Sequence, residues 1–216
     1  MPASQAAETH CPPQPQSARA ALTRANREAR RLLREKGLLA ASWAFRIHPV
    51  SAISGSIIDL GGTCLNAPAL AELCGSVTSV AAAACTLGPG VEARIASLFA
   101  TRQRVLAMAL DQVASERLFA LADQVHARIV REAGRRGLRA GLPEHPGDPG
   151  VALDAQAAVL ALAGVEAQAI TAISAGMLRP VKSLSFLVAL GADLPERGSE
   201  PRCARCASQG RCTFRK

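Results

Sequence analysis

The segment that decides the fold of this chain is residues 170–190, which read ITAISAGMLRPVKSLSFLVAL. Two short apolar runs, 169–173 and 184–190, lie on either side of a polar bend, and runs this short predict buried strands rather than helices. The bend contains Met177, Arg179, Pro180, Lys182 and Ser183. Because it carries two cations and hydroxyl groups, it is either a binding site for an anionic group or a solvated hairpin turn.

The composition is that of a globular protein. Of the 216 residues, 49% are hydrophobic and 19% are charged, which is enough apolar material for one core, with or without an appendage. No stretch approaches the roughly 20 apolar residues of a membrane span, and no secretory signal is evident, so we expect a cytoplasmic protein without membrane contact. The net charge of +8 suits an anionic partner, but five Phe, one Trp and no Tyr are too few for base stacking, so no nucleic-acid partner is expected.

Apolar periodicity predicts an α+β domain over residues 17–197, preceded by a disordered, proline-rich lead at residues 1–16. Helices are predicted over residues 17–36, 66–74, 91–133 and 151–163, and strands over residues 43–48, 57–58 and 77–86. The first helix carries arginines at helical spacing, which form either a solvated face or a docking stripe for an acidic partner. The strands are expected to form a mixed or antiparallel sheet.

Residues 134–150, GRRGLRAGLPEHPGDPG, contain five glycines and three prolines and predict a long loop without regular structure. Its glycines would let backbone amides approach a ligand closely, and the guanidinium of Arg139 could bind a carboxylate through two hydrogen bonds. This loop is therefore a candidate binding segment.

Residues 198–216 are predicted to form a basic tail with three cysteines, Cys203, Cys206 and Cys212. The CxxC spacing of the first two brings two thiolates to one point, as zinc or an iron–sulfur cluster requires. The fourth ligand is open, and the candidates are Cys11, Cys64, Cys74, Cys85, a histidine, a second chain or an exogenous group. The alternative is a redox-labile cysteine pair on a flexible tail.

Three separated parts of the sequence resemble one family. They are CTLGPGVEARIASLFA at residues 85–100 with ALDQVASERLFALADQV at residues 109–125, the loop at residues 139–150, and ISAGMLRPVKSLS at residues 173–185. Together they resemble the activation domain of cobalamin-dependent methionine synthase in its small stand-alone form. The ending Cys212-Thr-Phe214-Arg215 is similar to those stand-alone members, and the most specific match is Met-x-x-Pro-x-Lys-Ser-x-Ser at residues 177–185.

This resemblance implies a curved, mainly antiparallel sheet with flanking helices and a shallow site for S-adenosylmethionine. The ligand-binding candidates that it implies are Arg139, Gly147, Asp148, Lys182, Ser183 and Asp111. Arg139 looks like the carboxylate-binding arginine of the family, and Asp111 is the candidate for a second, cation-binding carboxylate. Asp148 stands where the family has the tyrosine of a Pro-Gly-Tyr run, and the chain contains no tyrosine.

The resemblance also implies an accessory role. In the family, a flavodoxin-type protein reduces inactive cob(II)alamin, and the methyl group of S-adenosylmethionine traps the product. The chain lacks the Asp-x-His-x-x-Gly pattern of a cobalamin-binding module, so we expect a separate corrinoid protein or methionine synthase core as partner, together with an electron-donor protein. Catalysis is then shared with the partner, and no residue of this chain is assigned a catalytic role.

The alternative function is that of a small iron–sulfur or zinc protein, in which the terminal cysteines carry the chemistry and the ligand site is vestigial. An independent methyltransferase that uses S-adenosylmethionine is not supported. Neither Gly61-Gly62 nor Gly88-Pro89-Gly90 completes the glycine-rich strand-to-helix turn of a doubly wound methyltransferase.

Overall fold

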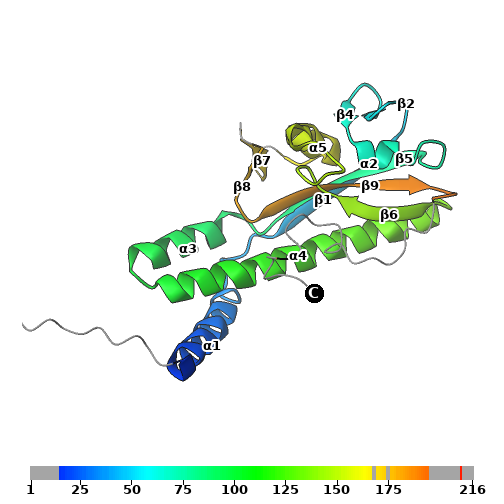
Figure 1. Cartoon of the computed structure of the whole chain (residues 1–216). Helices are drawn as coiled ribbons and strands as arrows, with labels where there is room; N and C mark the ends of the chain where they lie inside the picture. The colour runs from blue at the N-terminus through cyan, green and yellow to red at the C-terminus, as the bar shows by residue number, and fades with distance from the viewer. Residues whose placement is uncertain (1–14, 167–168, 174–175, 195–209, 211–216) are drawn as a thin grey trace, which may run out of the picture.

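The computed structural model describes residues 15–166, 169–173, 176–194 and 210, and shows an α+β fold built on a four-stranded antiparallel sheet (Figure 1). The strand order is β1 (Ser42–Pro49), β5 (Ser79–Thr86), β9 (Ser183–Gly191) and β6 (Arg139–Glu144). The α+β class and the antiparallel sheet that the sequence predicts are confirmed. The predicted disordered lead up to residue 14 and the cysteine-containing tail, except Gly210, lie outside the described residues.

Strands β5 and β9 are buried on both faces, and most of their side chains are apolar. Along β5, Ala81 and Ala83 belong to one hydrophobic cluster, and Ala82 and Ala84 belong to a second cluster on the opposite face. All four alanines are fully buried. Small side chains at the centre of the sheet let the layers on both faces approach it closely.

One face of the sheet is covered by α4 (Arg104–Arg135), against which α3 (Pro89–Ala100) and α1 (Pro15–Leu32) pack (Figure 1). The predicted helical region 91–133 is therefore two helices, and the turn between them contains Arg102, which has a φ of 61°. No helix in the described part of the chain has the length and apolar character needed to cross a membrane.

The other face of the sheet is covered by α5 (Gln156–Ala163), which follows a short 3-10 turn, η1 (Leu153–Ala155), and by α2 (Pro68–Ala71). Helix α5 ends at Gly164, whose φ of 72° is left-handed and favours glycine. A small antiparallel sheet packs beside α2 and consists of β2 (Ala52–Ser54), β3 (Ile57–Asp59) and β4 (Cys64–Asn66).

The prediction that residues 134–150 lack regular structure is wrong over Arg139–Glu144, which form β6. This strand pairs with β9 although it contains Gly141 and Pro143, because the register shifts between Ala140 and Pro143. Such a bulge accommodates residues that would break a regular ladder, and an edge strand tolerates a proline that an inner strand does not.

The segment 170–190 also differs from a single hairpin. Its first apolar run forms β7 (Thr171–Ala172), which pairs with β8 (Leu178–Arg179) rather than with β9. The second run forms β9, which lies between β5 and β6 in the main sheet. The segment therefore contains a small two-stranded sheet followed by an inner strand of the main sheet.

Candidate functional site

A pocket of about 260 Å³ opens where β9 begins. Its lining comes from residues 145–156, which follow β6, and from residues 176–185, which include β8 and the start of β9. Each segment overlaps a candidate binding segment of the sequence, namely the loop at residues 134–150 and the bend that carries Met177 and Ser183, whereas Leu153 and Gln156 lie outside both. The fold brings them together because β6 and β9 are neighbours in the sheet.

The floor of this pocket is polar and buried. Gln156, which is 5% exposed, donates a hydrogen bond from Nε2 to Oγ of Ser185 at 3.0 Å. Nδ1 of His145 lies 2.9 Å from the carbonyl oxygen of Ser185 and therefore carries the proton of that hydrogen bond. The floor thus presents hydrogen-bonding groups that are held in place before any ligand arrives.

The rim of the pocket is apolar. Leu153, Met177 and Val181 are 48%, 60% and 58% exposed. Leu153 packs between Gly147 and Gly176, and a Cβ atom on Gly176 would lie 2.7 Å from Cγ of Leu153. Exposed apolar side chains around a concave site are typical of a surface that binds a ligand or another protein.

The bend before β9 is held by hydrogen bonds on both sides. Oγ of Ser183 lies 2.8 Å from Oγ1 of Thr86 and 2.6 Å from the carbonyl oxygen of Pro180. The backbone N–H of Val181 donates to Oε2 of Glu92, on α3, at 3.1 Å. Ser183 therefore lines the pocket and also fixes the bend that forms part of its wall.

Lys182 points to the opposite face of the sheet, toward α4. Its Nζ lies 2.7 Å from Oδ1 of Asp111 and donates to Oγ of Ser115 at 2.8 Å. The lysine side chain is 10% exposed and the aspartate side chain is 50% exposed. The fold thus brings two of the sequence candidates together, but they neutralise each other and neither lines the pocket.

The remaining candidates lie apart from this ion pair. Gly147 and Asp148 are exposed in the turn after β6, where the N–H of Asp148 donates to the carbonyl oxygen of His145 at 3.0 Å. Arg139 lies at the other end of β6, opposite Gly191, and its guanidinium donates to the carbonyl oxygen of Leu194 at 3.2 Å. The structure therefore places Gly147 and Asp148 beside the pocket and Arg139 away from it.

Among the described residues, no group of three His, Cys, Asp or Glu side chains comes together to hold a metal ion. The predicted metal ligands Cys203, Cys206 and Cys212 lie outside the described residues. The metal site of the tail therefore stays a prediction.

We expect an alkylating reagent near pH 8 to modify Cys64 and Cys74 in the native protein and to spare Cys85. Cys64 and Cys74 are exposed, whereas Cys85 is buried in β5, and this burial raises the pKa of the Cys85 thiol to about 12. The reactive thiolate of Cys85 is then present in roughly one molecule in ten thousand. Peptide mass mapping measures the labelling, and equal labelling of Cys85 in native and urea-unfolded protein would contradict the expectation.

Sequence reasoning missed Gln156 and Ser185 as pocket residues. Each is a polar residue in an otherwise apolar element, since Gln156 begins the helix QAAVLALA and Ser185 lies in SLSFLVALG. Buried polar residues need hydrogen-bond partners. A polar residue within an apolar helix or strand was therefore the feature of the sequence that could have pointed to this site. Their pairing joins positions 29 residues apart, which local periodicity does not reveal.

A solved structure of the MetH reactivation domain bound to AdoHcy has the same fold. The match has a TM-score of 0.62 and 18% sequence identity, and it covers 82% of this chain and 66% of that chain. This chain thus spans just under two thirds of the length of the matched structure. No protein-family model and no curated protein sequence matches the chain. The match confirms the fold that the sequence resemblance implies. At 18% sequence identity, it is evidence for the fold and not for the function.

Proposed function

We propose that this chain is an accessory protein that assists reductive reactivation or methyl transfer of a separate corrinoid protein or methionine synthase core. The observation that carries the proposal is the fold, which matches the MetH reactivation domain over 82% of the chain. Because the sequence lacks a cobalamin-binding pattern of its own, the partner holds the corrinoid. An electron-donor protein supplies the reducing electron, and this chain does not catalyse the reaction alone.

The apolar rim of the pocket supports docking to such a partner. Leu153, Met177 and Val181 line one pocket, and each is about half exposed or more. The bend that carries Val181 is held firmly, because its backbone is bonded to Glu92 and its neighbour Lys182 is bonded to Asp111. Because its bend is held in this way, Val181 loses little backbone entropy when another protein covers it.

The described lining of the pocket does not fit the charged end of S-adenosylmethionine. The lining contains no aspartate, glutamate, lysine or arginine, whereas that ligand carries a carboxylate, an ammonium and a sulfonium group, and burying such charges without partners is costly. Lys182 is already paired with Asp111, and Arg139 lies at the far end of β6. The proposed role therefore rests on docking to the corrinoid protein and not on methyl supply from this pocket.

We expect S-adenosylmethionine and S-adenosylhomocysteine to bind the isolated chain with a Kd no tighter than about 1 mM. The reason is that the described pocket offers no partner for their carboxylate and ammonium groups. Calorimetric titration measures the binding. A micromolar Kd would contradict the expectation, and its loss in Arg139→Ala or in Lys182→Met would identify the cation responsible.

The test of the proposed function is anaerobic recovery of a corrinoid protein by the tagged chain. The visible spectrum of the recovered protein reports cobalamin, and the decay of cob(II)alamin absorption with an electron donor reports reactivation. We expect Met177→Glu and Val181→Glu to abolish recovery, because a carboxylate in an apolar contact must lose its water. Val130→Glu, at an exposed apolar position on α4, is the matched control. A wild-type chain that recovers no corrinoid protein would remove the basis of the proposal.

The alternative function, a small iron–sulfur or zinc protein, rests on the CxxC spacing of Cys203 and Cys206 with Cys212 nearby. Metal analysis and visible absorption of anaerobically purified protein test it directly. A colourless, metal-free protein that keeps its fold would exclude this alternative.

A further inference from the structure

The two edges of the main sheet differ in their protection against pairing with another strand. Strand β6 is interrupted by a register shift between Ala140 and Pro143, and it begins and ends with charged residues. Bulges, prolines and charges are devices that keep an edge strand from pairing. Strand β1, over Ser42–Pro49, keeps unbroken register with β5, and its proline is its last residue. The β1 edge therefore lacks most of the protection that the β6 edge has.

The backbone groups that β1 directs outward follow from the hydrogen bond at its end. The N–H of Val50 donates to the carbonyl oxygen of Thr78 at 2.9 Å and continues the β1–β5 ladder. Because hydrogen-bonded residues alternate in an antiparallel ladder, the even-numbered residues of β1 bond to β5. The N–H and C=O groups of Trp43, Phe45 and Ile47 therefore point outward from the open edge, in the plane of the sheet. In the described part of the chain, β5 is the only strand beside β1.

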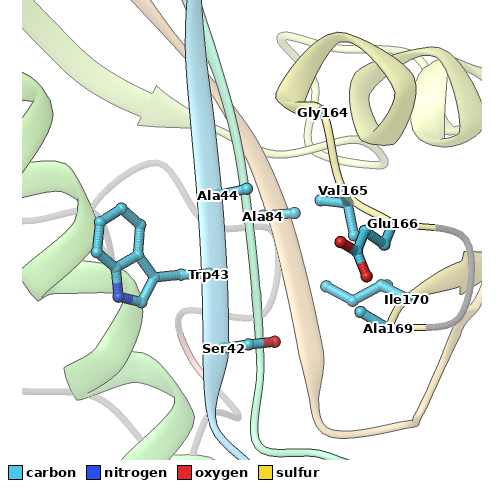
Figure 2. A pocket seen from close by; sticks show the side chains of 9 residues that line it. All are labelled: Ser42, Trp43, Ala44, Ala84, Gly164, Val165, Glu166, Ala169 and Ile170. Carbon is cyan, nitrogen blue, oxygen red and sulfur yellow. The ribbon is translucent and has the colours of Figure 1, made fainter.

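A second pocket, of about 340 Å³, lies beside this edge, between the two strands β1 and β5 and the segment after α5. Figure 2 shows Ser42, Ala44 and the Glu166 carboxylate on one side of β1 and the indole of Trp43 on the other side. The walls are mostly small or apolar side chains. Within the described residues, Glu166 makes no ion pair, and because it is exposed its carboxylate is accessible to a cation of another molecule.

Arg46 lies on the same face of β1 as this pocket. A side chain on Gly164 would collide with the guanidinium of Arg46, which places that guanidinium against the end of α5. Arg46 is exposed and is two positions along the strand from Ala44, which lines the pocket. One chain thus presents a cation and an anionic pocket side by side on the same face of one open edge.

We propose that a second copy of this chain adds its β1 to this edge in antiparallel orientation, with the twofold axis at Phe45. The two four-stranded sheets then join into one, and Trp43 lies opposite Ile47 of the partner subunit, an aromatic–β-branched pair of the kind that stabilises sheets. Arg46 of the partner subunit lies opposite Ala44, and its guanidinium binds Glu166. Each copy thus supplies an arginine that pairs with Glu166 of the other copy.

Charge and strand length favour the pairing with its axis at Phe45 over pairings shifted along the strand. A twofold axis at Arg46 would place the two copies of that arginine directly opposite each other, and like charges in that position destabilise a sheet. An axis at Ala44 would shorten the paired stretch from residues 42–48 to residues 42–46. The pairing is independent of the proposed accessory role, because it uses a different pocket and a different edge of the molecule.

The first test is the dimer dissociation constant, measured by sedimentation at an ionic strength of about 0.15 M, where screening limits the repulsion between copies that each carry +8. Arg46→Glu and Glu166→Arg should each raise the constant about tenfold or more, because each places like charges at both symmetric contacts. The double variant Arg46→Glu, Glu166→Arg should restore the dissociation constant to within about threefold of the wild-type value. The control Arg131→Glu, at an exposed position on α4, should leave the constant unchanged. A wild-type chain that stays monomeric at its highest soluble concentration overturns the proposal, as does a double variant that dimerises no better than the single ones.

The second test is amide hydrogen exchange at increasing protein concentration. The even-numbered amides of β1 are bonded within the sheet and should exchange slowly at all concentrations. The amides of Trp43, Phe45 and Ile47 should exchange fast in the monomer and become protected as the dimer forms. A dimer in which these three amides still exchange fast forms through another surface and overturns the proposal.

Discussion

Replacing Phe186 with alanine is expected to lower the free energy of unfolding by about 3–5 kcal/mol. Phe186 is fully buried in the middle of β9, within the hydrophobic cluster on the α4 face of the sheet. Its neighbour across the β5–β9 ladder is Ala83, which is too short to fill the space that the ring would leave. The loss therefore combines the transfer of the ring with a cavity that the core fills only in part.

Urea unfolding followed by circular dichroism measures this loss. The matched control is Phe99→Ala, because Phe99 is 47% exposed at the end of α3 and its loss should cost less than about 1 kcal/mol. The Phe186 ring also lies 5.5 Å from the ring of His145, so the variant should loosen the floor of the first pocket. Equal losses in the two variants would show that Phe186 does not occupy the core as described.

Replacing Asp111 with alanine is expected to destabilise the protein by about 2–3 kcal/mol, whereas replacing Lys182 with methionine should cost less than about 1 kcal/mol. The asymmetry follows from exposure, since the lysine side chain is 10% exposed and the aspartate side chain is 50% exposed. Without Asp111, the ammonium group stays buried beside the hydroxyl of Ser115 with no countercharge. Without the lysine charge, Asp111 remains half in water and is solvated there.

The double variant Asp111→Ala, Lys182→Met should be close in stability to Lys182→Met alone, because removal of the lysine charge removes the penalty for losing Asp111. Asp123→Ala, at an exposed position on the same helix, should change the free energy of unfolding by no more than about 0.5 kcal/mol. Denaturant unfolding of the wild type, the two single variants and the double variant gives the coupling energy. Additive losses would show that the two charges do not interact as the structure places them.

The inner strands were predictable from the sequence, because their signal is local. Strand β5 is a run of small apolar residues that ends at Gly88-Pro89-Gly90, and β9 is a run of larger ones. Strand β6 was not predictable, because Gly141 and Pro143 both disfavour a strand locally. Its stability comes from pairing with β9, about fifty positions later in the chain, and tertiary pairing overrides local propensity.

The candidate site was predictable in part. The bend at Lys182 and Ser183 stood out because polar residues interrupt apolar runs there, and the structure places Ser183 in the pocket and Lys182 against α4. Arg139 lies elsewhere because it and the turn at Gly147 are separated by the length of β6. Five extended residues cover about 17 Å, and this distance becomes apparent only once the segment is known to be a strand.

The inner position of β9 has a consequence for how this protein is made. Ser183 contacts Thr86, which is 97 residues earlier, and a ribosome adds about 5–20 residues per second. For roughly 5–20 s, a nascent chain therefore carries β5 with one edge unpaired, and α4 is synthesised during this interval. Late, non-local pairing slows folding and leaves strand edges open to aggregation. A translational pause just before residue 183 would thus prolong the most aggregation-prone stage of biogenesis, and a chaperone that covers the open edge of β5 would have its greatest effect there.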